Sequence, residues 1–154
     1  MNEVKDLVTN PFLLTSLSGW MVAQVLKVIS NAVVYKKLDF SRLFGDGGMP
    51  SGHSATVSSL ACITGLVYGL GSFEFAFTTI LAIIVCHDAT GVRMETGKQA
   101  MILNELRESL DIIFTDEVAS VKLKEMVGHT PFQVGAGIIL GVLDAIVVYN
   151  IFFL

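Results

Sequence analysis

The chain has 154 residues, of which 53% are hydrophobic and only 16% are charged, and its mean hydropathy is +0.67. A soluble domain carries about 25% charged residues, so the composition excludes a disordered chain and argues against an ordinary soluble enzyme. The net charge of −4 comes without a basic stripe, which excludes nucleic acid as a partner. The length predicts a single membrane-embedded domain covering residues 1–154.

Apolar stretches predict about four transmembrane helices, because a span needs about 20 apolar residues. They cover residues 11–35, 54–70, 73–86 and 131–154. The third stretch is short and ends at the polar pair His87 and Asp88. The predicted fold class is therefore an all-α integral membrane helical bundle.

A polar stretch, residues 93–124, separates the third and fourth spans and has helical periodicity. Its apolar residues at intervals of 3, 4 and 3 are Leu103, Leu106, Leu110 and Ile113. This stripe predicts an amphipathic helix that lies on the membrane surface or caps the bundle.

Basic residues are concentrated on one side of the predicted bundle. Four spans place both termini on one side, and eight of the 10 Lys and Arg residues fall on the other. Because cytoplasmic loops carry an excess of Lys and Arg, this second side is predicted to be cytoplasmic.

Polar residues cluster at the span ends on this cytoplasmic side. The first cluster, residues 45–54, reads GDGGMPSGHS and leads into a helix. Glycines allow the backbone to approach a ligand closely, and a helix N-terminus favours an anion such as phosphate. His53 lies in that first turn. The alternative is an ordinary glycine-rich turn before a helix that begins at Pro-Ser.

Two further clusters close the third span and open the fourth. Residues 87–100 contain His87, Asp88, Arg93 and Lys98, which a solvated loop at a membrane exit would explain in part. Residues 128–133 read GHTPFQ, in which Thr130, Pro131 and Gln133 predict a capping box. The capping box leaves His129 unexplained.

His53 and His129 are each predicted at a helix N-terminus on the same membrane face. A positive helix end disfavours the imidazolium, and a neutral His can act as a nucleophile or base. Together with Arg42, Arg93 and a glycine-rich loop, these are the groups needed for phosphoryl transfer. The three histidines and the carboxylates lack metal-ligand spacing, so neither a metal nor a cofactor is expected.

Polar residues also lie inside the predicted spans. Gln24, Lys27 and Asn31 form one stripe, and an intramembrane lysine is expected to face the protein interior. Asp144 lies too deep for direct catalysis and is expected to pair with Lys27 or Gln24. Small-residue pairs predict close helix packing, within the chain or in a homo-oligomer. They are Gly65/Gly69 and Gly137/Gly141.

Three segments resemble a known family. GGMPSGHSA resembles the second signature of the type 2 phosphatidic acid phosphatase superfamily, which includes the vanadium haloperoxidases, and GHTPFQVGAG resembles the third. HDATGVRMETGKQAMILNE is similar to a block of the divergent bacterial and plastid branch. The resemblance implies a metal-independent phosphatase of a bacterial cell membrane. It would cleave a lipid phosphate or diphosphate through a phosphohistidine, and its active face is expected to be cytoplasmic.

The resemblance also implies residue roles. By position, His129 would be the nucleophile and His53 the general acid, with Ser51 and Gly52 as donors to the phosphate. The candidate phosphate-binding cations are Arg93, Arg42, Lys27 and Lys98.

The chain departs from the family pattern at several positions. The first signature has no match, Gln133 replaces an Asp, and Leu123 replaces an Arg. Asp88 and Glu105 are the candidates to replace the missing carboxylate, and Arg93 is the candidate to replace the missing guanidinium. These departures favour an alternative function, in which a catalytically impaired relative binds or translocates a phosphorylated lipid.

Overall fold

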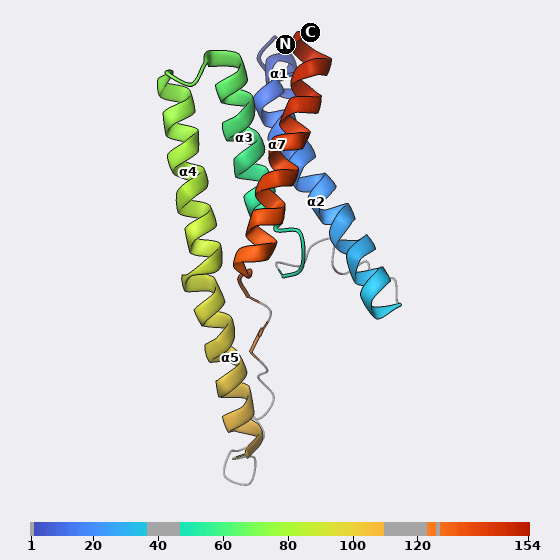
Figure 1. The fold of residues 1–154 in the computed structure, drawn as a ribbon, viewed down its shortest axis with the longest axis vertical. Helices are drawn as coiled ribbons and strands as arrows, with labels where there is room; N and C mark the ends of the chain where they lie inside the picture. Colours follow the sequence, from blue (N-terminus) through green and yellow to red (C-terminus); the bar gives the residue numbers. More distant parts are fainter. Residues whose placement is uncertain (1, 37–46, 110–122, 126) are drawn as a thin grey trace.

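Helices are the only regular elements among the residues that the computed structural model describes, which are 2–36, 47–109, 123–125 and 127–154. They are α1 (Asn2–Val8), α2 (Pro11–Tyr35), α3 (Gly52–Tyr68), α4 (Phe73–Thr90), α5 (Val92–Ser109) and α7 (Pro131–Phe153) (Figure 1). The predicted all-α fold is confirmed. The short helix α1 lies outside every predicted element.

A bundle of α2, α3, α4 and α7 forms the body of the molecule (Figure 1). The two termini and the turn between α3 and α4 lie at one end. The loop before α3 and the first turn of α7 lie at the opposite end, which we call the site end. Helix α3 contacts α2, α4 and α7, so it is the centre of the packing.

Three of the described helical stretches are long and apolar enough to cross a membrane: Pro11–Val34, Phe73–Ser109 and Pro131–Phe153. The second predicted span, residues 54–70, corresponds to α3, which has 17 residues. At 1.5 Å per residue this helix is roughly 25 Å long, close to the shortest length that spans a bilayer. Its buried face is rich in hydroxyls, including Ser54, Ser59 and Thr64, which lowers its hydropathy.

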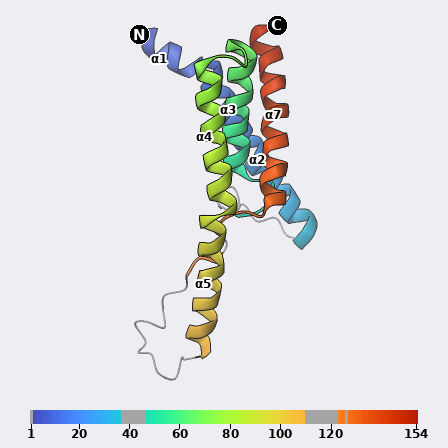
Figure 2. The ribbon, with the colours of Figure 1, turned by 60° about the vertical axis from the view of Figure 1, so that its left-hand side comes forward.

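The orientation of α5 differs from the prediction, which was a helix that lies on the membrane surface or caps the bundle. Figures 1 and 2 show α5 continuing the direction of α4 and projecting beyond the site end. Only Gly91 separates the two helices. Its N–H donates to His87 O at 2.8 Å, and its carbonyl accepts from Glu95 N at 3.0 Å. The nearly continuous hydrogen bonding keeps the two helices in line.

Glycines allow α7 to approach α3 within the chain. A Cβ at Gly137 would lie 2.5 Å from Ser51 O, and one at Gly141 would lie 2.9 Å from Ser59 N. At the other predicted pair, Gly65 faces the Phe75 ring, and Gly69 ends α3 with φ 85°. Gly65, Gly137 and Gly141 therefore serve packing inside one chain, whereas Gly69 serves the end of α3. The homo-oligomer stays a prediction.

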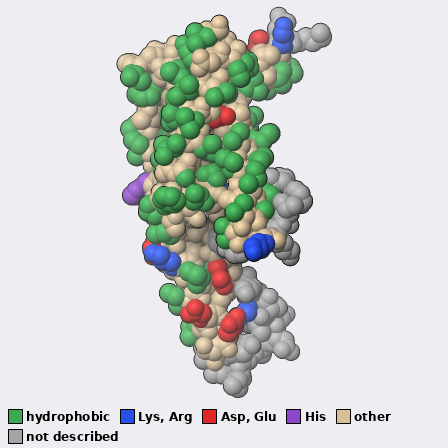
Figure 3. Space-filling view, turned by 45° about the vertical axis from the view of Figure 1, so that its right-hand side comes forward, with side chains coloured by type: hydrophobic (Ala, Val, Ile, Leu, Met, Phe, Trp, Pro, Cys, Tyr) green, Lys and Arg blue, Asp and Glu red, His purple; other side chains and the backbone are tan. Residues whose placement is uncertain are grey.

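The predicted partners of Asp144 were wrong. Its Oδ2 accepts a hydrogen bond from Ser18 Oγ at 2.7 Å. Lys27 lies nine residues further along α2, which is roughly 13 Å toward the site end. Asp144 therefore belongs to a separate, part-buried polar contact between α2 and α7. The outer surface of the bundle is covered mainly by apolar side chains (Figure 3).

Two glycines of α7 provide a matched test of this packing. We expect Gly141→Ala to lower the free energy of unfolding by about 1–3 kcal/mol, because the added methyl would overlap the α3 backbone. No atom lies within 4 Å of a Cβ at Gly135, so Gly135→Ala should raise stability by about 0.5–1 kcal/mol through helix propensity. Thermal unfolding of the purified protein in micelles, followed by circular dichroism, measures both. Equal shifts would contradict the packing.

Candidate functional site

The loop before α3 is attached to both neighbouring helices. Ser30 Oγ of α2 donates to Met49 O at 2.8 Å, and Ser51 N donates to Gln133 O of α7 at 3.1 Å. Gly48 has φ 103°, and a Cβ there would lie 3.1 Å from Lys27 Cγ. This residue must be glycine on both grounds, because its backbone is left-handed and lies against a lysine side chain.

Lys27 reaches this loop from inside α2. Its side chain is only 3% exposed, and Gln24, one turn earlier, is 7% exposed. Asn31 is half-buried. The predicted polar stripe of α2 therefore faces the protein interior, and its lysine stem lies beside the glycine-rich loop.

The first turn of α3 carries Ser51, Gly52 and His53. Ser51 is fully buried, and its Oγ accepts from Ser54 N at 3.3 Å and from Ser54 Oγ at 3.0 Å. The structure thus uses Ser51 as the N-cap of α3, whereas the resemblance implied a phosphate ligand. Gly52 is buried next to Trp20 and Gln24. The half-buried His53 follows at once.

The first turn of α7 contains the predicted capping box. Thr130 N donates to Gln133 Oε1 at 3.0 Å, and Gln133 N donates to Thr130 Oγ1 at 3.3 Å. The side chain of Gln133 is therefore engaged in its own helix cap. This use explains why a long amide suits the position, since a capping box requires Glu or Gln there.

His53 and His129 lie side by side at the site end. Their ring centroids are 5.9 Å apart and the rings are nearly perpendicular, at 77°. His129 is 2% exposed. The positive ends of α3 and α7 meet here, and the buried cation Lys27 lies against the adjoining loop. These charges favour an anion at the site end.

The chain returning from α5 fixes the backbone of His129. Its N–H donates to Ala89 O of α4 at 2.9 Å. Gly128, with φ 84°, lies so close to α5 that a Cβ would be 2.6 Å from Arg93 C. A Cβ at Gly97 would likewise lie 2.6 Å from Val127 O. Small residues on the inner face of α4 and α5 thus leave room for the segment that carries His129.

Asn104 holds the start of this returning segment. It is 3% exposed, and its Nδ2 donates to Leu123 O at 2.9 Å and to Glu125 Oε1 at 2.7 Å. Its Oδ1 accepts from Leu123 N at 3.1 Å. The sequence analysis missed Gly97, Gly128 and Asn104. The available signal was the helical spacing of Ala89, Gly97, Ala100 and Asn104, all of which are buried.

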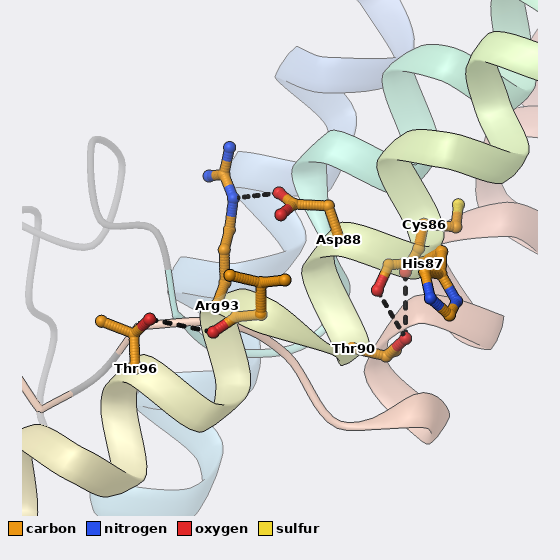
Figure 4. A network of polar contacts seen from close by, with 7 residues as sticks. Cys86, His87, Asp88, Thr90, Arg93 and Thr96 are labelled. Atoms are coloured by element: carbon orange, nitrogen blue, oxygen red, sulfur yellow. Dashed lines mark hydrogen bonds and ion pairs between the residues drawn. The ribbon is translucent and has the colours of Figure 1, made fainter.

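Asp88 and Arg93 form an ion pair with each other on the exposed face of α4 and α5. Arg93 Nε donates to Asp88 Oδ2 at 2.5 Å, and the two side chains are 47% and 40% exposed (Figure 4). The Arg93 backbone touches Gly128, but its guanidinium points toward Asp88 on the outer surface of the helix. The Asp88 carboxylate therefore neutralises Arg93 here.

The other predicted cations lie elsewhere. Lys98 Nζ pairs with Glu95 Oε1 at 2.7 Å, and both side chains are more than half exposed. Lys98 is nine residues beyond Ala89, or roughly 13 Å along the helix axis, on the part of α5 that projects from the bundle. Arg42 lies outside the described residues. Among the described residues, no group of three or more His, Cys, Asp or Glu side chains could hold a metal ion.

Gln24, which the sequence analysis placed in the polar stripe and not at the site, lies beside the candidate site. Its Oε1 is buried without a hydrogen-bond partner. The side chain lies beside the α3 N-terminus, because a Cβ at Gly52 would be 3.8 Å from Gln24 Cδ. A buried acceptor of this kind suits a ligand hydroxyl or a protonated phosphate oxygen.

Comparison with known proteins identifies the family. The sequence pattern described as the divergent PAP2 family matches residues 8–144. The chain belongs to the divergent PAP2 family. It is also 40% identical to the uncharacterized membrane protein YuiD of Bacillus subtilis (strain 168), over 96% of this chain and 99% of that protein. No solved structure gives a significant match.

The role of Asn104 in holding residues 123–125 can be tested without an activity assay. We expect Asn104→Ala to weaken the attachment of residues 123–125 by about 1–3 kcal/mol, because two backbone groups lose their buried partner. Amide hydrogen exchange at Leu123 and His129 should then be faster. Gln99→Ala, an exposed change on the same helix, is the control. Unchanged exchange at both amides would contradict the positioning role of Asn104.

Proposed function

We propose that this member of the divergent PAP2 family is a membrane phosphatase that cleaves a lipid phosphate or diphosphate through a phosphohistidine. The observation that carries the proposal is the placement of His53 and His129. Their rings lie 5.9 Å apart at the N-termini of two different helices. Groups that act on one phosphate must lie this close together.

The proposed chemistry requires two steps. A nitrogen of neutral His129 attacks phosphorus, the bond from phosphorus to the lipid oxygen breaks, and His53 gives its proton to that oxygen. Water then gives a proton to His53 and attacks phosphorus, the bond from phosphorus to the His129 nitrogen breaks, and inorganic phosphate and neutral His129 are released. The ring of His53 is half-buried, whereas His129 is almost fully buried, so the acid lies on the more accessible side.

Several groups are placed to bind the phosphate. The N-terminal ends of α3 and α7, which carry the positive ends of the helix dipoles, both lie at the site end. Lys27 supplies a buried positive charge beside Gly48. In a water-poor site, such donors and charges bind an anion strongly without reorganising. Gln24 Oε1 supplies an acceptor next to Gly52.

One observation favours a second candidate, a catalytically impaired relative that binds or translocates a phosphorylated lipid. Gln133 stands where the family has an Asp, and its side chain caps its own helix. An amide adds no charge to stabilise an imidazolium. In serine proteases the comparable change costs about four orders of magnitude in rate.

The three histidines provide the decisive test. We expect the purified protein to release inorganic phosphate from phosphatidic acid in micelles, and His129→Ala to abolish the release. His53→Ala should lower the rate by about 10²–10⁴-fold for an alkyl leaving group, and less for an aryl phosphate, whose leaving group needs no proton.

The control variant is His87→Ala, because His87 is exposed on α4. It should retain the wild-type rate. Full activity in His129→Ala would rule out the phosphohistidine route. Binding of phosphatidic acid by the wild type without phosphate release would select the second candidate.

We further propose that the site end faces the cytoplasm, because most Lys and Arg residues of the chain lie on that side of the spans. Single cysteines are introduced at Glu3 and Gln99, both exposed, in a background lacking Cys62 and Cys86. On intact cells, an impermeant thiol reagent should label Glu3→Cys and spare Gln99→Cys. The reverse pattern would invert the topology and place the substrate in the outer leaflet.

A further inference from the structure

The described residues line more than one apolar groove along the bundle, and two of these bear on the candidate site. The first, which we call the α2–α7 groove, has a volume of about 480 Å³. Its lining includes Leu26, Ile29, Met49, Pro50, Ala136 and Ile139. The second, the α3–α4 groove, has a volume of about 580 Å³. Its lining includes Ala61, Leu66, Leu70, Phe75, Ala82 and Val142.

The α2–α7 groove adjoins the loop that leads into the candidate site. Met49 and Pro50 of that loop line the groove, and the next residue, Ser51, caps α3. Ser30 also lines the groove, but its hydroxyl is bonded to Met49 O at 2.8 Å. On the other side of Met49, Gly48 lies against the Lys27 stem. A ligand with its phosphate at the histidines would therefore direct its remainder toward these apolar walls.

The α3–α4 groove points elsewhere. Its lining runs from Ser58 to Leu70 and Phe75, at the turn between α3 and α4. Figure 1 places that turn at the end of the bundle opposite the site. None of its lining residues belongs to the loop before α3 or to the segment around His129. It has similar size and polarity, so it serves as an internal control.

We propose that the α2–α7 groove holds the hydrocarbon chain of the phosphorylated lipid on which the site acts. This inference rests on the proposed function, since the phosphate at His53 and His129 defines where the chain begins. The groove offers only apolar side chains and one hydroxyl that is already bonded, so it suits a hydrocarbon chain better than a sugar or a peptide. The bilayer interior is as apolar as these walls, so moving the hydrocarbon chain from the bilayer into the groove adds little binding free energy. The groove acts instead by orienting the phosphate for attack.

Matched alanine substitutions test the groove by chain length. Ala136 lines the α2–α7 groove and Ala82 lines the α3–α4 groove, and both are half-buried. The substrates are hexadecyl phosphate and butyl phosphate, supplied to the intact protein in micelles. Ala136→Phe should reduce the ratio of kcat/KM for hexadecyl over butyl phosphate by about tenfold. Ala82→Phe should leave this ratio within about twofold of wild type. Equal losses in both variants would overturn the proposal.

A second measurement needs neither a variant nor turnover. The wild-type protein in nanodiscs is irradiated with a hexadecyl phosphate that carries a diazirine near the middle of its chain, and labelled residues are located by mass spectrometry. Labelling that concentrates on Leu26, Ile139 and Leu143, and that excess butyl phosphate suppresses, supports the groove. Labelling on Ala61 and Ala82, or spread evenly over all outward faces, overturns it. Absence of phosphate release by the wild type would refute catalysis, while the label position still decides the groove.

Discussion

The contact between the glycine face of α7 and the first half of α3 determines where the candidate site forms. Gly137 and Gly141 allow the α3 backbone to lie where side chains would otherwise be. With larger residues at these two positions, α3 and α7 would lie further apart, and so would their N-terminal turns. Here the hydrogen bond from Ser51 N to Gln133 O joins the two N-terminal turns directly. His53 and His129 meet because each belongs to one of these turns.

The long helical unit of α4 and α5 serves the same site from a distance. It contributes Ala89, whose carbonyl binds the His129 N–H, and Asn104, which holds the chain before it returns to the bundle. Between them, Gly97 and Gly128 permit close contact of two backbones. The polar segment after the third span therefore has a structural role, which is to hold the chain that carries His129. Its charged residues had instead suggested a role in binding phosphate. Arg93 and Lys98 pair with neighbouring carboxylates on the exposed faces.

Local patterns in the sequence predicted the parts of the site that depend on neighbouring residues. The capping box of Thr130 and Gln133, the buried stripe of Gln24 and Lys27, and the helix start before His53 all follow from spacings of a few residues. Contacts between distant segments could not be predicted in this way. Asn104 meets Leu123 across 19 residues, and Ser18 meets Asp144 across 126. Many polar partners fit such positions, and only the packing of the helices selects one.

The amide of Gln133, in place of the family's Asp, affects two properties of the proposed site differently: the binding of a phosphate and the chemical step. In the proposed function, a phosphate is bound by Lys27 and the helix N-termini, and none of these needs a carboxylate at position 133. The proposed chemical step would develop positive charge on His129, where a neutral amide gives less stabilisation than an Asp would. The absence of the carboxylate would therefore weaken catalysis more than affinity. It also leaves out a negative charge that would oppose an anionic ligand, so an amide at position 133 favours retention of a phosphorylated lipid over its cleavage.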